Sequence, residues 1–294
     1  MIVTCLIGDP VQHSVSNYMY DYFANEIGIE YSHVKFRISS KNKNNLKLAI
    51  DALRALGIKG ANVTLPYKTE VMKYLDRIDG PARLAGAVNT ILNRNNKLIG
   101  YNTDGRGAIM GIERHLKRID KDDYITILGA GGAARAILFE LLKKTKNITI
   151  INRKVDFSIA ENLKLDFKKI GKKIEILPLN DANIISGVSK ANIIINATPV
   201  GMFPKTRRSL ISEDHFKKIN EISAIENKYF FDVIFNPQLT KLLLISKRYG
   251  AKICSGLYML IYQGTESFKI WTGVQISNKR AVKNLEILKR KVCE

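Results

Sequence analysis

Short apolar runs alternate with amphipathic segments along the first third of the chain. The apolar runs have the length of β-strands, whereas the segments between them repeat apolar residues every three or four positions, as helices do. The pattern predicts strands at IVTCLIG, EYSHVKFRI, GANVTL, AVNTIL and KLIGYN, and helices at SNYMYDYFANEIG, NLKLAIDALRALG and YKTEVMKYLDRI. This alternation is typical of an α/β sheet, which we expect over residues 1–105.

A second alternating series follows a helix predicted at about 105–118. Its strand-like runs are YITIL, NITII, KIEIL, ANIIINA, KYFFDVIF and AKIC, with helical or looped segments between them. About six such strands have the size of a doubly wound, Rossmann-type dinucleotide-binding unit. The last segments, SGLYMLIYQGTESFKIWTG and NKRAVKNLEILKRKV, have helical patterns.

Composition and charge indicate which classes of binding partner the protein has. The chain has 294 residues, of which 46% are apolar and 25% charged, enough to build and cover the cores of two domains. Lys and Arg total 47 against 27 Asp and Glu, a formal net charge of +20. The basic residues lie in short groups such as LKKTK and FKKIGKK, without a long run and without interleaved aromatic residues. We therefore assign most of this charge to solvated surface and predict no nucleic-acid or membrane partner.

The spacing of cysteine and histidine excludes two further kinds of site. Cys5, Cys254 and Cys293 form an odd set without metal or redox spacing, and the four histidines are far apart. We predict neither a disulfide framework nor a metal site. The opening MIVTCLIGDP has the pattern of a strand and a turn rather than of a signal peptide, and no apolar run approaches the ~20 residues of a membrane span. The expected location is the reducing cytoplasm.

A glycine-rich turn follows the first strand of the second series. GAGGAA at 129–134 fits the pattern G-x-G-x-x-G/A between a strand at 124–128 and a helix at 134–144. Gly129 permits a tight turn, Gly131 lets the backbone approach a pyrophosphate, and the small Ala134 allows close contact between helix and strand. A dinucleotide would then place its phosphates at the amino end of the helix.

The end of the next strand indicates which dinucleotide is bound. An NAD site has an acid there, about twenty residues past the glycines, but this chain has Asn152, Arg153 and Lys154. A guanidinium and an ammonium suit the 2′-phosphate of NADP. Two alternatives stay open: a solvated basic turn, and a ribose contact from Asp156.

Lys68 and Asp104 are candidates for proton transfer. Pro66 suits the first turn of a helix that we expect to continue through Ile78, which would place Lys68 near the positive end of the helix dipole, where a cation is mildly disfavoured. That position suggests a function, although an exposed lysine is the alternative. Asp104 begins the next predicted helix, as an N-cap, as a partner that holds the ammonium while the lysine moves a proton, or as both.

Three further polar residues have two interpretations each. Ser14 and Ser16 precede a helix, so they either cap it or bind a carboxylate together with backbone amides. Gln263 interrupts an apolar helical face, so it needs a partner on a neighbouring helix or a ligand hydroxyl.

The chain resembles the shikimate dehydrogenase family over nearly its whole length. The resemblance rests on nine ordered motifs: GDPVQHSVS, GANVTLPYK, AGAVNT, GYNTDGRG, GAGGAARA, NR, NATPVGM, DVIFNP and GLYMLIYQG. It implies the reversible, NADP-dependent reduction of 3-dehydroshikimate to shikimate, a step of the chorismate pathway to aromatic amino acids. It also implies a substrate-binding and catalytic domain at 1–105, a Rossmann-type NADP domain at 106–239, and C-terminal helices at 240–294 that pack back on the first domain.

The resemblance also assigns residues to roles. For the substrate and the proton it implies Ser14 and Ser16 at the carboxylate, Thr64, Asn89, Asp104 and Gln263 at the hydroxyls, Phe235 near the substrate, and Lys68 as acid and base. For the cofactor it implies Gly129, Ala130, Gly131, Gly132, Ala133, Asn152, Arg153, Lys154, Thr198, Met202, Val233, Gly256 and Met259, of which Gly256 and Met259 lie near the nicotinamide.

Four positions depart from the family pattern. Asn17 replaces a proline, Tyr20 a histidine, Phe235 a tyrosine that contacts substrate, and Lys154 a threonine. The change at Phe235 removes a hydroxyl, whereas Lys154 keeps the cofactor turn cationic. None of them alters the two residues assigned to proton transfer, so they bear on affinity and substrate choice.

Three other functions stay open at this stage. A quinate/shikimate dehydrogenase using NAD is compatible with Asp156 and Phe235, and a catalytically idle relative would bind NADP(H) without turnover. A nucleic-acid-binding role would require salt-sensitive binding. The expected assembly is a monomer or a homodimer.

Overall fold

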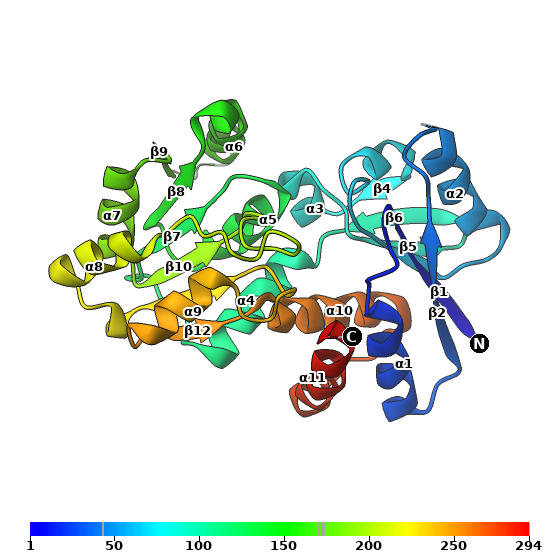
Figure 1. Cartoon of the computed structure of the whole chain (residues 1–294). Coiled ribbons are helices and arrows are strands. Elements are labelled where there is room, and N and C mark those ends of the chain that lie inside the picture. Colours follow the sequence, from blue (N-terminus) through cyan, green and yellow to red (C-terminus); the bar gives the residue numbers. More distant parts are fainter. Residues whose placement is uncertain (43, 170, 172–173, 294) are drawn as a thin grey trace. The chain divides into compact units, whose positions relative to one another are not determined.

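Two compact α/β units make up the chain (Figure 1). The computed structural model describes residues 1–42, 44–169, 171 and 174–293. One unit is built from residues 1–107 and 261–294, and the other from residues 108–260. Both contain a six-stranded sheet, which confirms the predicted fold class.

The first unit has a mixed sheet in the order β2-β1-β3-β5-β6-β4. Its strands are β1 (Ile2–Gly8), β2 (Tyr31–Arg37), β3 (Gly60–Val63), β4 (Arg77–Ile78), β5 (Thr90–Arg94) and β6 (Lys97–Tyr101). Its helices are α1 (Ser16–Ile27), α2 (Asn44–Ala55), α3 (Gly80–Ala85), α11 (Asn278–Cys293), the start of α4 (Asp104–His115) and the end of α10 (Gly256–Thr272).

Several loops lie at one edge of this sheet because of the directions of its strands. β1 pairs in parallel with β2 and β3, whereas β5 runs antiparallel to both β3 and β6. The carboxyl ends of β1, β3 and β6 and the amino end of β5 therefore share one edge.

Each face of this sheet is covered by helices because successive strand residues point to opposite sides. On one face α2 buries Leu46, Ile50 and Leu53 against the strands. On the other face lies a buried aromatic cluster from α1, β2 and α10, namely Tyr20, Phe23, Tyr31, His33, Phe268 and Trp271. The C-terminal helices thus return to the first unit, where Asn284 of α11 donates to the carbonyl of Met19 in α1 at 3.0 Å.

Gly60 allows a close approach of α10 to the sheet. A Cβ on Gly60 would lie 2.2 Å from Nε1 of Trp271 and 2.3 Å from the carbonyl of Ile91, which that Nε1–H contacts at 2.8 Å. We expect Gly60→Ala to lower the free energy of unfolding by about 2–3 kcal/mol, because helix and strand must separate. Urea unfolding followed by circular dichroism measures the change. The control is Gly80→Ala, where a Cβ meets nothing within 4 Å; equal stabilities of the two variants would contradict the prediction.

The helix predicted from Pro66 through Ile78 is not present. Residues 65–69 form turns, a 3₁₀ helix covers Glu70–Tyr74, and β4 follows at Arg77–Ile78. The segment leaves the helical path because β4 pairs with β6 and because the Asp76 carboxylate accepts the backbone N–H of Leu98 at 2.6 Å. Lys68 therefore lies in a turn, and the argument from a helix dipole does not apply to it.

The second unit is a doubly wound parallel sheet in the order β12-β11-β10-β7-β8-β9. Its strands are β7 (Ile125–Leu128), β8 (Ile148–Asn152), β9 (Glu175–Pro178), β10 (Ile193–Asn196), β11 (Tyr229–Asp232) and β12 (Lys252–Cys254). Its helices are α5 (Gly132–Leu141), α6 (Phe157–Lys169), α7 (Asp181–Lys190), α8 (Glu213–Ile222) and α9 (Lys241–Arg248), with most of α4 and the start of α10. Counted from β7, this is the strand order 3-2-1-4-5-6 of dinucleotide-binding folds.

Alternate strand residues divide the core of this unit in two. Ile125, Ile127 and Ile195 pack with α4, α5 and α6, whereas Leu128 and Ile194 pack with α7, α8 and α9. The unit extends to residue 260, beyond the boundary expected at 239, because β12 pairs with β11 and α9 packs beside both. No helix in the described part of the chain is long and apolar enough to cross a bilayer.

Candidate active site

Polar side chains converge at the shared edge of the first sheet. Ser14 and Ser16 follow β1, Thr64 and Lys68 follow β3, Asn89 precedes β5, and Asp104 follows β6. The topology brings them together although up to ninety residues separate them in sequence. Backbone bonds fix the edge: the N–H of Asn89 donates to the carbonyl of Tyr101 at 3.1 Å, and that of Val88 to the carbonyl of Lys68 at 2.7 Å.

Lys68 and Asp104 form an ion pair. Nζ of Lys68 lies 2.7 Å from Oδ2 of Asp104, and the two side chains are 30% and 11% exposed. Among the described residues Asp104 is the only hydrogen-bond partner of this ammonium, so N–H donors remain for a ligand oxygen. The Asp104 side chain does not cap α4, since its oxygens accept from Lys68 and Asn89.

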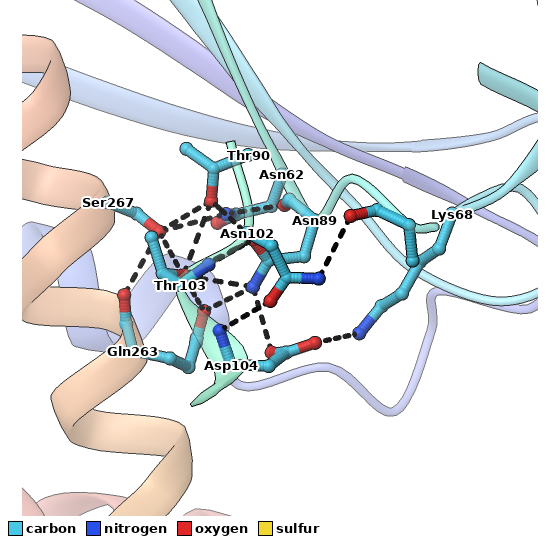
Figure 2. A network of polar contacts seen from close by, with 10 residues as sticks. Asn62, Lys68, Asn89, Thr90, Asn102, Thr103, Asp104, Gln263 and Ser267 are labelled. Carbon is cyan, nitrogen blue, oxygen red and sulfur yellow. Dashed lines mark hydrogen bonds and ion pairs between the residues drawn. The ribbon is translucent and has the colours of Figure 1, made fainter. Parts of the chain in front are cut away.

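Asn89 orients the carboxylate of this pair (Figure 2). Its Nδ2 donates to Oδ1 of Asp104 at 2.8 Å, while its Oδ1 accepts the backbone N–H of Thr103 at 2.9 Å. Asn89 is 3% exposed, so it is held by the protein rather than by solvent. A carboxylate with both oxygens engaged keeps one orientation toward the ammonium.

A buried network extends from Asn89 to α10. Figure 2 shows it from close by, with Asn62, Thr90, Thr103, Gln263 and Ser267 around Asn89. Ser267 lies 2.8 Å from the hydroxyl of Thr90 and 3.2 Å from that of Thr103, and Oε1 of Gln263 accepts from Thr103 at 3.3 Å. The partners of Gln263 thus include loop residues, whereas the two alternatives predicted were a neighbouring helix and a ligand hydroxyl.

Four members of this network are absent from the predicted site: Asn62, Thr90, Thr103 and Ser267. A signal for three of them was present in the sequence. Asn and Thr inside the otherwise apolar runs GANVTL and AVNTIL, and Thr before Asp104, would be buried, and buried polar groups require partners. Ser267 carried no such signal, because a serine in a helix can bond its own backbone, as its hydroxyl does with the carbonyl of Gln263 at 3.0 Å.

Ser14 and Ser16 lie together at the start of α1. The Ser14 hydroxyl donates to Oγ of Ser16 at 3.0 Å and accepts the Ser16 N–H at 3.3 Å. The N-cap, Val15, makes no side-chain cap bond, and the first turn has no acid. The two serines are therefore not ordinary caps, and their hydroxyls and the first-turn amides suit a carboxylate.

The glycine turn in the second unit fits a pyrophosphate. Gly129 has φ +97°, a conformation that favours glycine, and a Cβ there would lie 2.6 Å from Thr198. A Cβ on Gly131 would meet nothing within 4 Å, so this backbone is open to a ligand. Gly131 is the N-cap of α5 and provides no side-chain cap, which leaves amide N–H groups for phosphate oxygens.

The basic turn after β8 contains its own acid. Nη2 of Arg153 lies 2.5 Å from Oδ2 of Asp156. Nδ2 of Asn152 donates to the backbone carbonyl of Asp156 at 2.8 Å. The Arg153 side chain is 65% exposed and Lys154 is exposed, so both can reach a phosphate. Asp156 is engaged by the guanidinium, which weakens the case for a ribose contact from it.

The other expected cofactor residues also follow strands of the second sheet. Thr198 and Met202 follow β10, Val233 follows β11, and Gly256 and Met259 begin α10 after β12. A Cβ on Gly256 would lie 2.1 Å from the carbonyl of Val233, so only glycine fits. Met202 is 43% exposed, whereas Met259 is buried in the core beside α4. Phe235 lies in the same unit, in the loop after β11.

Asp232 holds the loop that carries Thr198. Its carboxylate accepts from Nδ2 of Asn196 at 3.1 Å and from the Thr240 hydroxyl at 2.7 Å, and Oδ1 of Asn196 accepts from the Thr198 hydroxyl at 2.7 Å. Burial raises the pKa of Asp232 to about 6, against the lowering effect of its hydrogen bonds.

This pKa predicts a pH dependence of stability. The folded protein holds the Asp232 proton more tightly than the unfolded chain does. The protonated Asp232 therefore contributes fully to the free energy of unfolding below about pH 4, and this contribution is lost as the pH rises through about 6. Between these values we expect the free energy of unfolding to fall by about 3 kcal/mol more in the wild type than in Asp232→Asn. Urea unfolding at each pH measures it, with the exposed Asp122→Asn as control. If the free energy of unfolding changed with pH in the same way in the wild type and in Asp232→Asn, the raised pKa of Asp232 would be disproved.

Comparison with known proteins gives one consistent family. Family models match at residues 6–91 (shikimate dehydrogenase substrate binding domain), 113–239 (shikimate / quinate 5-dehydrogenase) and 256–281 (shikimate 5′-dehydrogenase C-terminal domain). The NADP(+) shikimate dehydrogenase of Methanocaldococcus jannaschii is 44% identical over 295 residues, which cover 98% of this chain and 95% of that protein.

Solved structures agree. A crystal structure of shikimate dehydrogenase in complex with NADP+ matches with a TM-score of 0.86 at 42% identity, covering 98% of this chain and 96% of that one. A shikimate 5-dehydrogenase from Listeria monocytogenes in complex with shikimate and NAD also matches with a TM-score of 0.86, at 31% identity and the same coverage.

Proposed function

The chain belongs to the shikimate dehydrogenase family, and from this premise we propose how its residues carry out the NADP-dependent, reversible reduction of 3-dehydroshikimate to shikimate. The observation that carries the proposal is the ion pair of Lys68 and Asp104, whose ammonium keeps N–H donors for a ligand and is partly exposed. NADPH, when bound, supplies the hydride for the ketone carbon.

Lys68 transfers the proton to and from the reacting oxygen. As negative charge develops on the ketone oxygen, the Lys68 ammonium donates a hydrogen bond to that oxygen and then its proton, which leaves a neutral amine and a hydroxyl. In the oxidation of shikimate the amine takes the proton back. Asp104 stays ionised, and it holds Nζ in place through the 2.7 Å contact.

The remaining polar residues position the substrate. Ser14 and Ser16 bind the carboxylate with the first-turn amides of α1, and Thr64, Asn89 and Gln263 bind hydroxyls. Support comes from their common edge of the sheet and from the network that fixes Asn89. A cyclohexene bearing a carboxylate at one end and hydroxyls at the other matches this division of donors.

In the second unit the proposed NADP site uses the glycine turn at 129–133 for the pyrophosphate and Arg153 and Lys154 for the 2′-phosphate. Asn152 shapes the turn, Thr198 and Met202 line the nucleotide, and Val233, Gly256 and Met259 complete the nicotinamide end. The open backbone at Gly131 and the exposed cations support this assignment.

Initial rates test the function. We expect fast turnover with shikimate and NADP, and slow turnover with quinate or with NAD, when the two substrates and two cofactors are crossed. Faster turnover with quinate and NAD would contradict the proposal and favour the quinate/shikimate class. Tight NADP binding without turnover of either substrate would show an idle relative.

We also propose a cytoplasmic location, either as a monomer or as a homodimer. Cys5 and Cys254 are buried free thiols, and burial raises the pKa of Cys5 to about 12, so neither is built for disulfide exchange. Sedimentation at several protein concentrations decides between the two states of assembly.

A further inference from the structure

Two cations of β2 flank the loop that leads to Ser14 and Ser16, and they differ in one respect. Arg37 is paired with an acid: its Nε lies 2.7 Å from the Asp9 carboxylate, which Ser40 also contacts. Lys35 instead donates to two backbone carbonyls of the loop, those of Gln12 at 3.2 Å and Ser14 at 3.1 Å. Among the described residues no carboxylate lies within ion-pair distance of Lys35. Its charge is therefore uncompensated.

The position of Lys35 follows from the strand. Residues 31, 33, 35 and 37 share one face of β2, and Tyr31 and His33 place that face against α1. Lys35 is partly buried, and its ammonium contacts the loop that precedes α1. Burial, and to a smaller extent the charge of Lys35, lower the pKa of His33 to about 3. The Lys35 charge therefore acts on a neighbouring side chain of the same strand face.

The carbonyls that Lys35 contacts belong to the loop that carries both serines. Because Nζ bonds the carbonyl of Ser14 itself, it fixes the backbone from which the Ser14 hydroxyl reaches Ser16. The ammonium thus contacts the backbone of Ser14, whose hydroxyl is one of the two assigned to the substrate carboxylate. This contact is partly buried, and water screens charge less there than at an open surface.

We propose that Lys35 is a positioning residue that makes the site selective for a carboxylate-bearing substrate, by supplying the uncompensated positive charge beside Ser14 and Ser16. This role rests on the proposed function, since it takes the serine pair as the carboxylate site. It adds to that function a residue outside the nine motifs of the family.

The test crosses protein variants with two substrates, shikimate and its methyl ester, which lacks the negative charge. We expect Lys35→Met to raise KM for shikimate about tenfold and to change kcat less than about twofold, because the lost interaction is present in ground and transition states alike. For methyl shikimate the wild type and Lys35→Met should have the same KM. Lys35→Arg should keep most of the affinity for shikimate, because it keeps the charge.

Two matched variants separate charge from loop structure. Lys97→Met removes one positive charge from an exposed strand position of the same unit, and it should leave both KM values unchanged. Arg37→Gln weakens an anchor of the same loop without removing an uncompensated charge, so any rise in KM should be equal for acid and ester. An equal rise for both substrates in Lys35→Met, or no rise for shikimate, overturns the proposal.

Calorimetric titration of shikimate into each protein keeps this test distinct from that of the function. A wild type that neither oxidises nor binds shikimate overturns the proposed function and the role of Lys35 together. A wild type that is active, with Lys35→Met binding shikimate equally tightly, overturns only the role of Lys35. If Lys35→Met fails to fold, Lys35→Gln and Lys35→Arg are compared, and equal selectivity for acid over ester in these two contradicts the proposal.

Discussion

Replacement of Lys68 by alanine is expected to lower kcat by at least about 10², with a smaller effect on KM. The reason is that the proton donor is lost, while the serines and the hydroxyl-binding residues still bind the substrate. The ketone oxygen must then take its proton from water. Initial rates over a range of shikimate concentrations measure both constants.

Lys68→Arg separates proton transfer from charge. A guanidinium can maintain the contact with Asp104, but it does not release a proton in proteins. We therefore expect Lys68→Arg to be nearly as slow as Lys68→Ala, whereas Lys73→Ala, an exposed lysine of the following 3₁₀ helix, should behave as wild type. Near-normal turnover in Lys68→Ala would remove the lysine from the mechanism, and recovery in Lys68→Arg would reduce its role to that of a charge.

Replacement of Arg153 by alanine is expected to weaken NADP binding about tenfold to a hundredfold and to leave NAD binding nearly unchanged. A charge-assisted bond to phosphate contributes roughly 1.5–3 kcal/mol, and only NADP carries the 2′-phosphate. Calorimetric titration of each cofactor measures the dissociation constants. Lys164→Ala, which removes an exposed cation from α6, is the control.

Asp156 provides the second half of this test. It is paired with Arg153 at 2.5 Å, so Asp156→Asn frees the guanidinium and should tighten NADP binding or leave it unchanged. A selective loss of NAD binding in Asp156→Asn would assign the carboxylate to the ribose. Equal losses of NADP and NAD in Arg153→Ala would show that the arginine does not recognise the phosphate.

Local pattern was sufficient for the second unit and misleading for one segment of the first. The central strands β7 and β10 are buried along their whole length, so their sequences are mostly apolar, and the glycine turn follows β7 at the expected place. In the segment 66–78, apolar residues recur at helical spacing, but β4 pairs with β6, about twenty residues later. Pairing over that distance has no local signal.

The same limit applies to the site. Asp104 could be proposed as an N-cap or as a partner of Lys68, and residue chemistry alone did not decide between them. Lys68 and Asp104 are 36 positions apart in sequence. The hairpin of β5 and β6 lies between them and brings Asn89 beside Asp104. The resemblance to a family supplied the pair. The sequence indicated only that Thr90 and Thr103 would be buried and need partners, and the structure was required to show that Ser267 lies between them.

Trp271 is the only tryptophan of the chain, and it lies in the first unit, 2% exposed, with its indole bonded to the carbonyl of Ile91. Its emission therefore reports on one half of the molecule: the maximum should be at short wavelength in the folded protein and should shift to the red only when the substrate-binding unit opens. Circular dichroism, by contrast, records both halves. If the two signals change at different denaturant concentrations, the units unfold separately, and the stability of each can be obtained from the intact chain.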